Sequence, residues 1–274
     1  MGRGASAAED FLVEFHRRTP SCTPLAFADR AAVGDGFAWS SSYDALAELA
    51  RPADRSILDV ACGDGYLLER LHARAPQAAL VGIDMSDGEL AAARDRLGER
   101  AELRLERAQA LSMPDACVDL ATCHMAFMLM DDAPAVVAEL RRVLRPGGRV
   151  GLVIGRGMAD TPAEAVYLRL LRAAFASEGV PPLRLGDPVL RRDDGLALLF
   201  ADGFTDHAQC DFEVGFVGDV AALWREITLS YDLWRLSPSG REALREAVCA
   251  EWAALEAPLS LVWRLRRFTA TRAR

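Results

Sequence analysis

The chain has 274 residues, of which 51% are hydrophobic and 26% are charged. This length allows one large domain whose core needs neither disulfides nor metal ions. The net charge is −8, from 40 acidic and 32 basic residues, and each of those basic residues is arginine. An acidic surface repels phosphate groups, so the charge argues against a nucleic-acid substrate. The lack of lysine excludes a lysine base or Schiff-base former.

The six cysteines are scattered along the chain, and no two of them form a C-x-x-C pair. A zinc knuckle or a thioredoxin-like site is therefore not expected. Met1–Asp10 lacks the apolar segment of a secretory signal. No apolar run reaches the roughly 20 residues that span a bilayer. We expect a cytoplasmic protein with reduced thiols and no membrane partner.

Residues 1–50 predict a helical cap. Ala5–Arg18 has the apolar spacing of a short amphipathic helix, and Ser42–Ala50 has the spacing of a second one. The segment Thr19–Gly36 between them is rich in turn formers and small residues. The aromatic residues of the cap are candidates for closing over a ligand bound to the core: Tyr43, Phe37 and Trp39.

Residues 51–155 alternate between short apolar strands and helices, which is typical of a parallel, doubly wound sheet. The predicted strands are Ser56–Cys62, Ala79–Ile83, Leu103–Arg107, Val118–His124 and Arg149–Ile154. The predicted helices are Gly65–Ala73, Asp87–Leu97, with Ser86 as its cap, and Ala133–Leu144.

Residues 156–274 are more helical and end in a strand that alternates arginine with apolar residues. The predicted elements are helices Pro162–Ser177 and Asp193–Asp202, strand Thr205–Val217, a mostly helical Asp219–Glu256 and strand Leu261–Thr271. We therefore expect one α/β domain with a Rossmann-like, doubly wound, mostly parallel seven-stranded sheet and an antiparallel last strand. The N-terminal helical cap and a helical insertion before the last strand complete it.

The most informative stretch follows the first strand of the core. That strand carries Asp59 to its carboxyl end, where Gly63 and Gly65 allow a tight turn and a close approach of ligand. The next strand ends in Asp84, whose carboxylate can accept from both hydroxyls of a ribose. Ligands of open α/β sheets bind at this edge. An oxidoreductase that binds a nicotinamide dinucleotide would need a third glycine, but Leu68 occupies that position.

Here the sequence resembles the class I S-adenosylmethionine-dependent methyltransferases, in particular the ubiquinone/menaquinone-biosynthesis-like, type 11 group. The resemblance covers about residues 56–154 in order and spacing. The segments that carry it are Leu58–Leu71, Gly82–Ser86, Leu111–Leu120 and Glu139–Gly148.

The resemblance implies that S-adenosylmethionine is the cofactor and S-adenosylhomocysteine the product. The cofactor-binding residues that it implies are Asp59, Ala61, Cys62, Gly63 and Gly65 around the methionine moiety, Asp84 at the ribose, Met85, Ala108 and Gln109 at the adenine, and Tyr43 in the cap.

One residue departs from the family pattern. Family members often have an aspartate before the alanine that borders adenine, where it accepts from the adenine amino group. This chain has Arg107 there, and arginine has only donors. Glu106 or a backbone carbonyl would have to accept instead.

The end of the fourth core strand holds the candidate catalytic residue, His124. A hydroxyl acceptor needs a base, so His124 is a candidate general base or substrate orienter; a histidine packed under the cofactor is the alternative. The apolar run after it could form part of an acceptor pocket, as could the aromatic residues of the insertion, which are Trp224, Tyr231 and Trp234. Adjacent Asp131 and Asp132 are interpreted as charges at a helix start, and no metal site is expected.

The sequence thus predicts an enzyme that methylates a small molecule, apolar or aromatic, of the secondary-metabolite kind, with O-methylation favoured over N or C. Two alternatives remain open: a methyltransferase-like protein repurposed as a cyclase or scaffold, and a methyltransferase of protein or nucleic acid. The D/N-P-P-Y/F stretch of amino-directed nucleic-acid enzymes is replaced here by residues 124–127. Exposed aromatics of the cap would suit a homodimer contact as well as a pocket.

Overall fold

The computed structural model describes residues 6–274. Residues 1–5, which include Ala5 at the predicted start of the first helix and half of the segment examined for a secretory signal, lie outside the described part. The strands are β1 (Ala32–Gly34), β2 (Phe37–Trp39), β3 (Ser56–Val60), β4 (Ala79–Asp84), β5 (Glu102–Leu105), β6 (Val118–His124), β7 (Leu144–Met158), β8 (Phe204–Gly218) and β9 (Leu259–Arg272).

The α-helices are α1 (Ala7–Arg18), α2 (Cys22–Phe27), α3 (Asp44–Ala47), α4 (Tyr66–Arg74), α5 (Asp87–Leu97), α6 (Ala133–Val143), α7 (Pro162–Glu178), α8 (Gly195–Leu199), α9 (Val220–Ile227) and α10 (Pro238–Ala253). Short 3-10 helices are η1 (Gly98–Arg100), η2 (Phe127–Leu129), η3 (Pro188–Arg191) and η4 (Tyr231–Arg235).

The strands of the described residues form one sheet in the order β2-β1-β8-β9-β7-β6-β3-β4-β5. The five strands from β7 to β5 pair in parallel, as residues 51–155 predict. In this half, β3 pairs with both β4 and β6, so the carboxyl ends of three strands meet at one edge. The site predicted from Asp59 and Asp84 lies at this edge.

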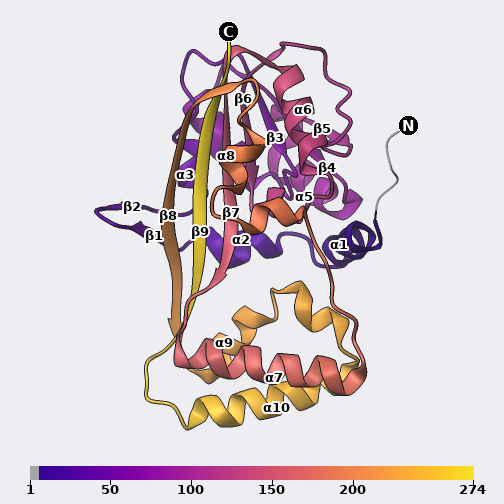
Figure 1. Ribbon diagram of the computed structural model, residues 1–274, viewed down its shortest axis with the longest axis vertical. Helices are drawn as coiled ribbons and strands as arrows, with labels where there is room; N and C mark the ends of the chain where they lie inside the picture. The colour runs from indigo at the N-terminus through magenta and orange to yellow at the C-terminus, as the bar shows by residue number, and fades with distance from the viewer. Residues whose placement is uncertain (1–5) are drawn as a thin grey trace.

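The predicted α/β, Rossmann-like class is confirmed, but the predicted strand number of seven is wrong. The sheet has nine strands, because β1 and β2 add an antiparallel hairpin beside β8. Half of the strand pairings are therefore antiparallel, rather than only those of the last strand. Strands of three residues are too short to show a period of two, and β1 forms where the edge of β8 offers backbone partners. Figure 1 shows this hairpin projecting at the left.

Both faces of the sheet are covered. One apolar core joins the sheet to α6 and α8, and a second joins it to α3, α4 and α5. A third core, around the buried Trp252, holds α7, α9, η4 and α10 together below the sheet (Figure 1). The helical insertion predicted before the last strand, Asp219–Glu256, contributes α9, η4 and α10 to this layer, whereas α7 comes from the segment before β8. None of the described helices is long and apolar enough to cross a lipid bilayer.

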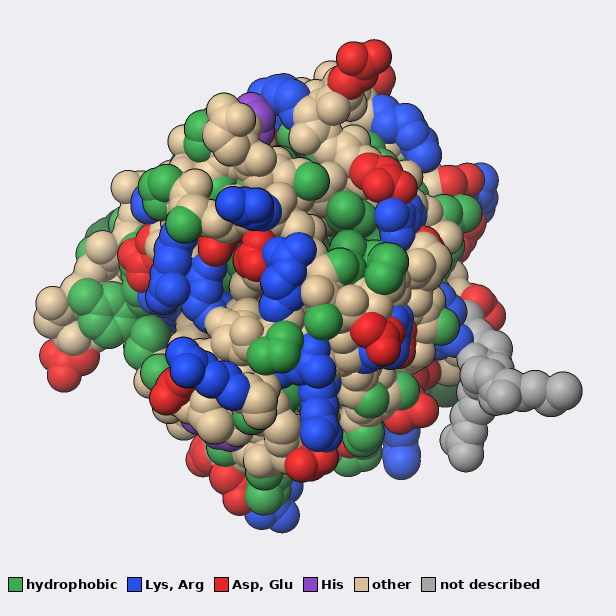
Figure 2. All heavy atoms as spheres, turned by 90° about the horizontal axis from the view of Figure 1, so that it is seen from above, with side chains coloured by type: hydrophobic (Ala, Val, Ile, Leu, Met, Phe, Trp, Pro, Cys, Tyr) green, Lys and Arg blue, Asp and Glu red, His purple; other side chains and the backbone are tan. Residues whose placement is uncertain are grey.

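The surface at the upper end of Figure 1 carries both signs of charge. Figure 2 shows arginine side chains lying among aspartate and glutamate side chains over this face. Arginine and carboxylate side chains also form ion pairs in the parallel half of the sheet, as between Arg145 and Asp119 at 2.5 Å. Neighbouring carboxylates partly neutralise such arginines, so they provide a weaker field for a phosphate backbone than their number suggests.

Candidate active site

The turn after β3 takes a shape that its glycines make accessible. Ala61 and Gly63 have φ angles of 54°, and Gly65 has 79° as the residue before α4. These angles lie in the left-handed region, which glycine adopts at little cost. A side chain on Gly65 would also bring its Cβ within 2.6 Å of Leu97 Cδ1. The glycine therefore lets α4 and α5 pack closely behind the turn.

Asp84, at the end of β4, fixes the same turn from the neighbouring strand. Its Oδ2 accepts from the backbone N–H of Gly63 at 2.9 Å, and its Oδ1 accepts from that of Ser86 at 2.8 Å. Each carboxylate oxygen has two lone pairs, so both oxygens can still accept from a ligand hydroxyl. Ser86 caps α5 by accepting from Glu89 N at 3.3 Å, as the sequence predicts.

Two carboxyl groups lie at this edge, the buried Asp59 and the half-buried Asp84. Burial raises the pKa of Asp59 to about 8, against a hydrogen bond from Thr122 Oγ1 at 2.8 Å that lowers it, and the charge of Asp84 raises it further. Burial likewise raises the pKa of Asp84, against the two backbone donors. Because burial makes these two carboxyl groups costly to ionise, a cationic ligand beside them would stabilise their charged forms.

A cavity of about 1030 Å³, counted with its opening to solvent, lies over this edge. Its wall includes every residue predicted to bind the cofactor or to act in catalysis except Gly65, which shapes the turn instead. Those residues are Tyr43, Asp59, Ala61, Cys62, Gly63, Asp84, Met85, Ala108, Gln109 and His124. Elements distant in the chain thus meet around one space, and the cofactor roles of these residues stay predictions.

His124 is buried in the wall as a neutral imidazole. It is 7% exposed, and burial lowers its pKa to about 3. Its Nε2 lies 2.9 Å from Ser42 Oγ, and its ring stacks on Tyr43 at 3.7 Å. Its Nδ1 is buried without a hydrogen-bond partner among the described residues. A buried polar atom in this state favours a ligand that bonds to it.

Helix α1 lines the cavity, and polar contacts near both of its ends hold it against the core. Near its start, Glu9 is buried and accepts from Gln109 Nε2 at 3.3 Å, from Asp131 N at 3.2 Å and from Arg107. Near its end, His16 Nδ1 lies 2.8 Å from a carboxylate oxygen of α5. The predicted cap helix is therefore one wall of the site.

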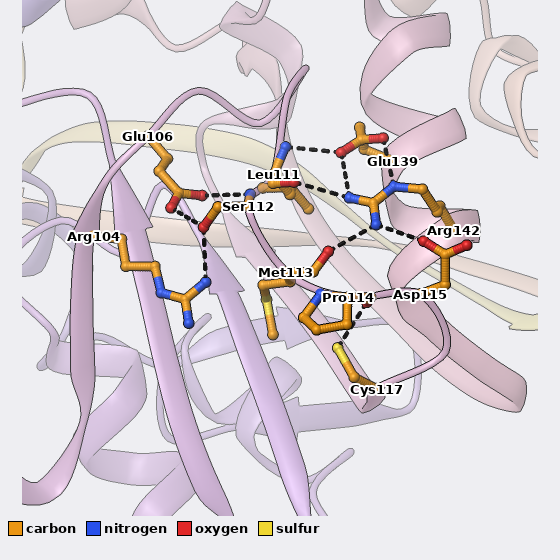
Figure 3. A network of polar contacts seen from close by, with 10 residues as sticks. All are labelled: Arg104, Glu106, Leu111, Ser112, Met113, Pro114, Asp115, Cys117, Glu139 and Arg142. Atoms are coloured by element: carbon orange, nitrogen blue, oxygen red, sulfur yellow. Dashed lines mark hydrogen bonds and ion pairs between the residues drawn. The ribbon is translucent and has the colours of Figure 1, made fainter.

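The loop between β5 and β6, which carries Ala108 and Gln109, is held by a network of polar contacts. Figure 3 shows Arg142 of α6 lying between this loop and Glu139. Its guanidinium donates to the carbonyl oxygens of Leu111 at 2.9 Å and Met113 at 2.7 Å, and to Glu139 at 2.7 Å.

Glu106, at the other end of the same network, is already engaged. Its carboxylate accepts from Ser112 N at 3.1 Å and from the Ser112 hydroxyl (Figure 3). It lines the cavity, and each of its oxygens keeps a second lone pair. The carboxylate that approaches Arg107 is Glu9, which the sequence did not indicate.

We expect Arg142→Met to lower the free energy of unfolding by about 1–3 kcal/mol, because carbonyl oxygens of the loop lose a charged donor. The neighbouring Arg141→Met is the control, since Arg141 pairs with the exposed Asp202 and should contribute little. Chemical denaturation measures both variants. Equal losses for the two would contradict a role for the Arg142 network.

Several aromatic residues that the sequence offered as pocket walls lie elsewhere. Phe37 and Trp39 belong to the β2 hairpin, where Trp39 packs on Phe212 at 5.4 Å. Tyr231 and Trp234 pack edge-on against Phe15 of α1 at 6.2 and 5.6 Å, and Trp224 packs within the helical insertion. These side chains are absent from the residues that line the described cavity. Helical spacing shows which residues share a face, but not which surface that face meets.

The cavity wall also includes Met125, Leu129 and Met130 from the apolar run after His124, and Glu106, all of which the sequence offered as candidates. The residues of the wall that the sequence did not predict are Glu9, Leu12, Val13, His16, Thr23, Pro24, Asp64, Tyr66, Leu67, Ile83, Ser86, Glu89 and Ala126. Those before residue 25 precede the glycine turn by more than thirty positions. Those next to the motifs, such as Asp64 and Ser86, could have been found from strand-end position alone.

The order of strands and the cavity at the carboxyl ends of β3 and β4 define a Rossmann-like domain with a cavity at the edge where open α/β sheets bind ligands. Residues 57–148 match the model of a family described as a methyltransferase domain. This part of the chain is a class I S-adenosylmethionine-dependent methyltransferase domain, as the motifs predict.

Curated relatives agree with this family. The chain is 39% identical over 134 residues to a demethylmenaquinone methyltransferase of Deinococcus radiodurans, a match that covers 48% of this chain and 54% of that protein. The chain spans about half the length of the curated relatives it matches.

Solved structures share the fold over more of the chain. A putative methyltransferase from Bacillus halodurans superposes with a TM-score of 0.58 at 17% identity, over 85% of this chain and 99% of that one. The [4+2]-cyclase SpnF superposes with a TM-score of 0.59 at 18% identity, over 100% and 99%. Because the identities are this low, these likenesses show the fold alone.

Proposed function

We propose that this protein transfers a methyl group from S-adenosylmethionine to a small, largely apolar acceptor. The observation that carries the proposal is a pair of carboxyl groups, the buried Asp59 and the half-buried Asp84, which line one cavity at adjacent strand ends. Burial raises the pKa of both, so a cation beside them would relieve the cost of their charge. S-adenosylmethionine would bring an ammonium group, a sulfonium methyl donor and a ribose diol.

The chain's own residues then have distinct tasks. Asp84 would accept from the ribose hydroxyls with the lone pairs that Gly63 and Ser86 leave free. Asp59 would stand near the ammonium group. Glu9 is our proposed acceptor for the adenine amino group, because Arg107 and Gln109 bring its carboxylate to the loop that borders adenine.

The acceptor would lie beside His124, where the wall is mostly apolar. The apolar residues of the cavity wall include Leu12, Val13, Pro24, Met125, Leu129 and Met130. Methionine adapts to irregular ligands, which suits an apolar or aromatic molecule. One curated relative is named for its acceptor, demethylmenaquinone, which is a small molecule. That likeness supports a small-molecule acceptor, as a proposal for this chain.

His124 would orient the acceptor rather than carry its proton. With a pKa of about 3, its imidazolium would be a poor product of proton abstraction near neutral pH. Its free Nδ1 can form one hydrogen bond, whose direction depends on the tautomer that Ser42 selects. An acceptor that ionises readily, or a carbon or nitrogen nucleophile, fits this better than an ordinary hydroxyl.

The test is mass analysis of products from an acceptor screen with S-adenosylmethionine. A product heavier by one CH₂ unit, formed with S-adenosylhomocysteine, supports methyl transfer. A product of unchanged mass, formed only when the cofactor is present, would replace the proposal with a cyclase or isomerase. If calorimetry detects no cofactor binding by the folded protein, the proposal is wrong.

We expect His124→Phe to lower kcat by more than about tenfold while the affinity for S-adenosylhomocysteine changes little, because phenylalanine keeps the stacking on Tyr43 and removes the polar atom. The exposed His207→Phe is the control. If His124 only orients the acceptor, the plot of wild-type kcat against pH should show no inflection from a histidine between mildly acidic and neutral pH. An inflection there that His124→Phe removes would make His124 a proton carrier.

A further inference from the structure

Three side chains with metal-binding atoms converge where the cap meets the core. His16 is near the end of α1, Cys22 begins α2, and Glu89 lies in the first turn of α5. His16 Nδ1 lies 2.8 Å from Glu89 Oε1 and 3.7 Å from Cys22 Sγ. The three ligand atoms all lie within 4.8 Å of one another. Sequence spacing does not predict this group, because Glu89 is 73 residues after His16.

One of the printed distances between these atoms already fits a tetrahedral zinc site, and another needs a small outward movement. Ligand atoms about 2.0–2.3 Å from Zn²⁺ lie about 3.3–3.7 Å from one another at tetrahedral angles. The distance of 3.7 Å between the sulfur and the nitrogen falls in this range, and the carboxylate would move outward by about half an ångström from the imidazole. A protonated His16 makes these contacts as an ion pair with Glu89, and a metal cation would take the place of that proton.

The surroundings of the group also suit a metal ligand set. Cys22 is 6% exposed and Glu89 is 4% exposed, so water competes weakly for them. The second oxygen of Glu89 accepts from the backbone N–H of Ser21 at 3.1 Å. That bond orients the carboxylate and leaves Oε1 facing His16, as outer-shell partners of metal ligands do.

We propose that His16, Cys22 and Glu89 bind a divalent cation of the zinc class. A thiolate, a carboxylate and a neutral imidazole would balance the two positive charges, and a mixed sulfur, nitrogen and oxygen set suits a borderline-soft ion. Three protein ligands leave a fourth position for water or for a ligand in the cavity, whose wall includes His16 and Glu89. The ion would join α1 and α2 to α5 and so fasten the cap over the cofactor cavity. This site does not depend on methyl transfer.

The experiment is a titration of the metal-free, reduced protein with Co²⁺, without cofactor. We expect one equivalent to bind, with a thiolate-to-cobalt charge-transfer band in the near ultraviolet, and Zn²⁺ to displace it. Cys22→Ser should remove the band, whereas Cys249→Ser, on α10, should keep it. His16→Gln and Glu89→Gln should weaken Co²⁺ binding by more than about tenfold. Zn²⁺ should raise the Tm of the wild type but not of Cys22→Ser.

Three outcomes would overturn the proposal. They are a folded wild type that binds no Co²⁺, a band that survives Cys22→Ser, and a band that Cys249→Ser removes. If Cys22→Ser does not fold, the His16→Gln and Glu89→Gln titrations and the wild-type stoichiometry decide. Because no cofactor is added, failure of the metal site leaves the methyltransferase proposal standing, and the reverse also holds.

Discussion

Asp84→Ala is expected to weaken S-adenosylhomocysteine binding by at least about 100-fold, because two charge-assisted hydrogen bonds to the ribose would be lost at about 1.5–3 kcal/mol each. The substitution also releases the N–H groups of Gly63 and Ser86, which now donate to Asp84. Calorimetry on the purified variant measures the affinity, and circular dichroism checks that it is folded.

Asp95→Ala is the control, since Asp95 is an exposed aspartate on α5, the helix that follows β4. It should bind like the wild type. Asp84→Asn separates the contribution of charge from that of shape, because the amide keeps one acceptor oxygen. Binding by Asp84→Ala at wild-type affinity would remove Asp84 from the cofactor site and with it the main support for the proposed function.

Asp59→Asn is expected to change how stability depends on pH. Burial raises the folded-state pKa of Asp59 to about 8 from an ordinary value of 3.8. The folded state therefore keeps a proton that the unfolded state releases, so this group's contribution to the free energy of unfolding falls as pH rises from about 4 to about 8, by at most about 1.4 kcal/mol per pH unit. Asparagine has no proton to lose, and its oxygen can still accept from Thr122.

Chemical denaturation of both proteins at acidic, neutral and alkaline pH measures this. Above pH 8 the variant should be the more stable protein, and the difference should disappear in acid. Asp119→Asn should show the opposite sign. Burial opposes the charge of Asp119, but bonds from Arg145 and from the N–H groups of Arg55 and Ser56 outweigh it and lower its pKa. A stability difference between wild type and Asp59→Asn that does not vary with pH would contradict the raised pKa.

Cofactor binding provides a second test of the raised pKa of Asp59. An ammonium group placed beside it would favour the carboxylate, so binding below pH 8 should release a proton. Calorimetry in buffers of different ionisation enthalpy would detect that proton in the wild type and its loss in Asp59→Asn. Equal proton release by both proteins would show that another group titrates.

The sequence by itself determined the parallel half of the sheet and the centre of the site. The glycine turn after β3 and Asp84 after β4 are marked by residues that lie within a few positions of their own strand. A buried strand, a turn that needs positive φ and a capped helix are local features, each specified by neighbouring residues. Asp59, Gly63 and Asp84 could therefore be placed at one edge before any contact was seen.

The tertiary structure decided what covers that edge. Glu9 and His16 reach the cavity only because α1 crosses it, and the environment of His124 depends on Ser42 and Tyr43, some eighty residues earlier. The β1–β2 hairpin forms against β8, far along the chain. Such contacts carry no local pattern, because their energy comes from burial and hydrogen bonds between segments that only the folded chain brings together. For the same reason, the group of His16, Cys22 and Glu89 becomes visible only in three dimensions.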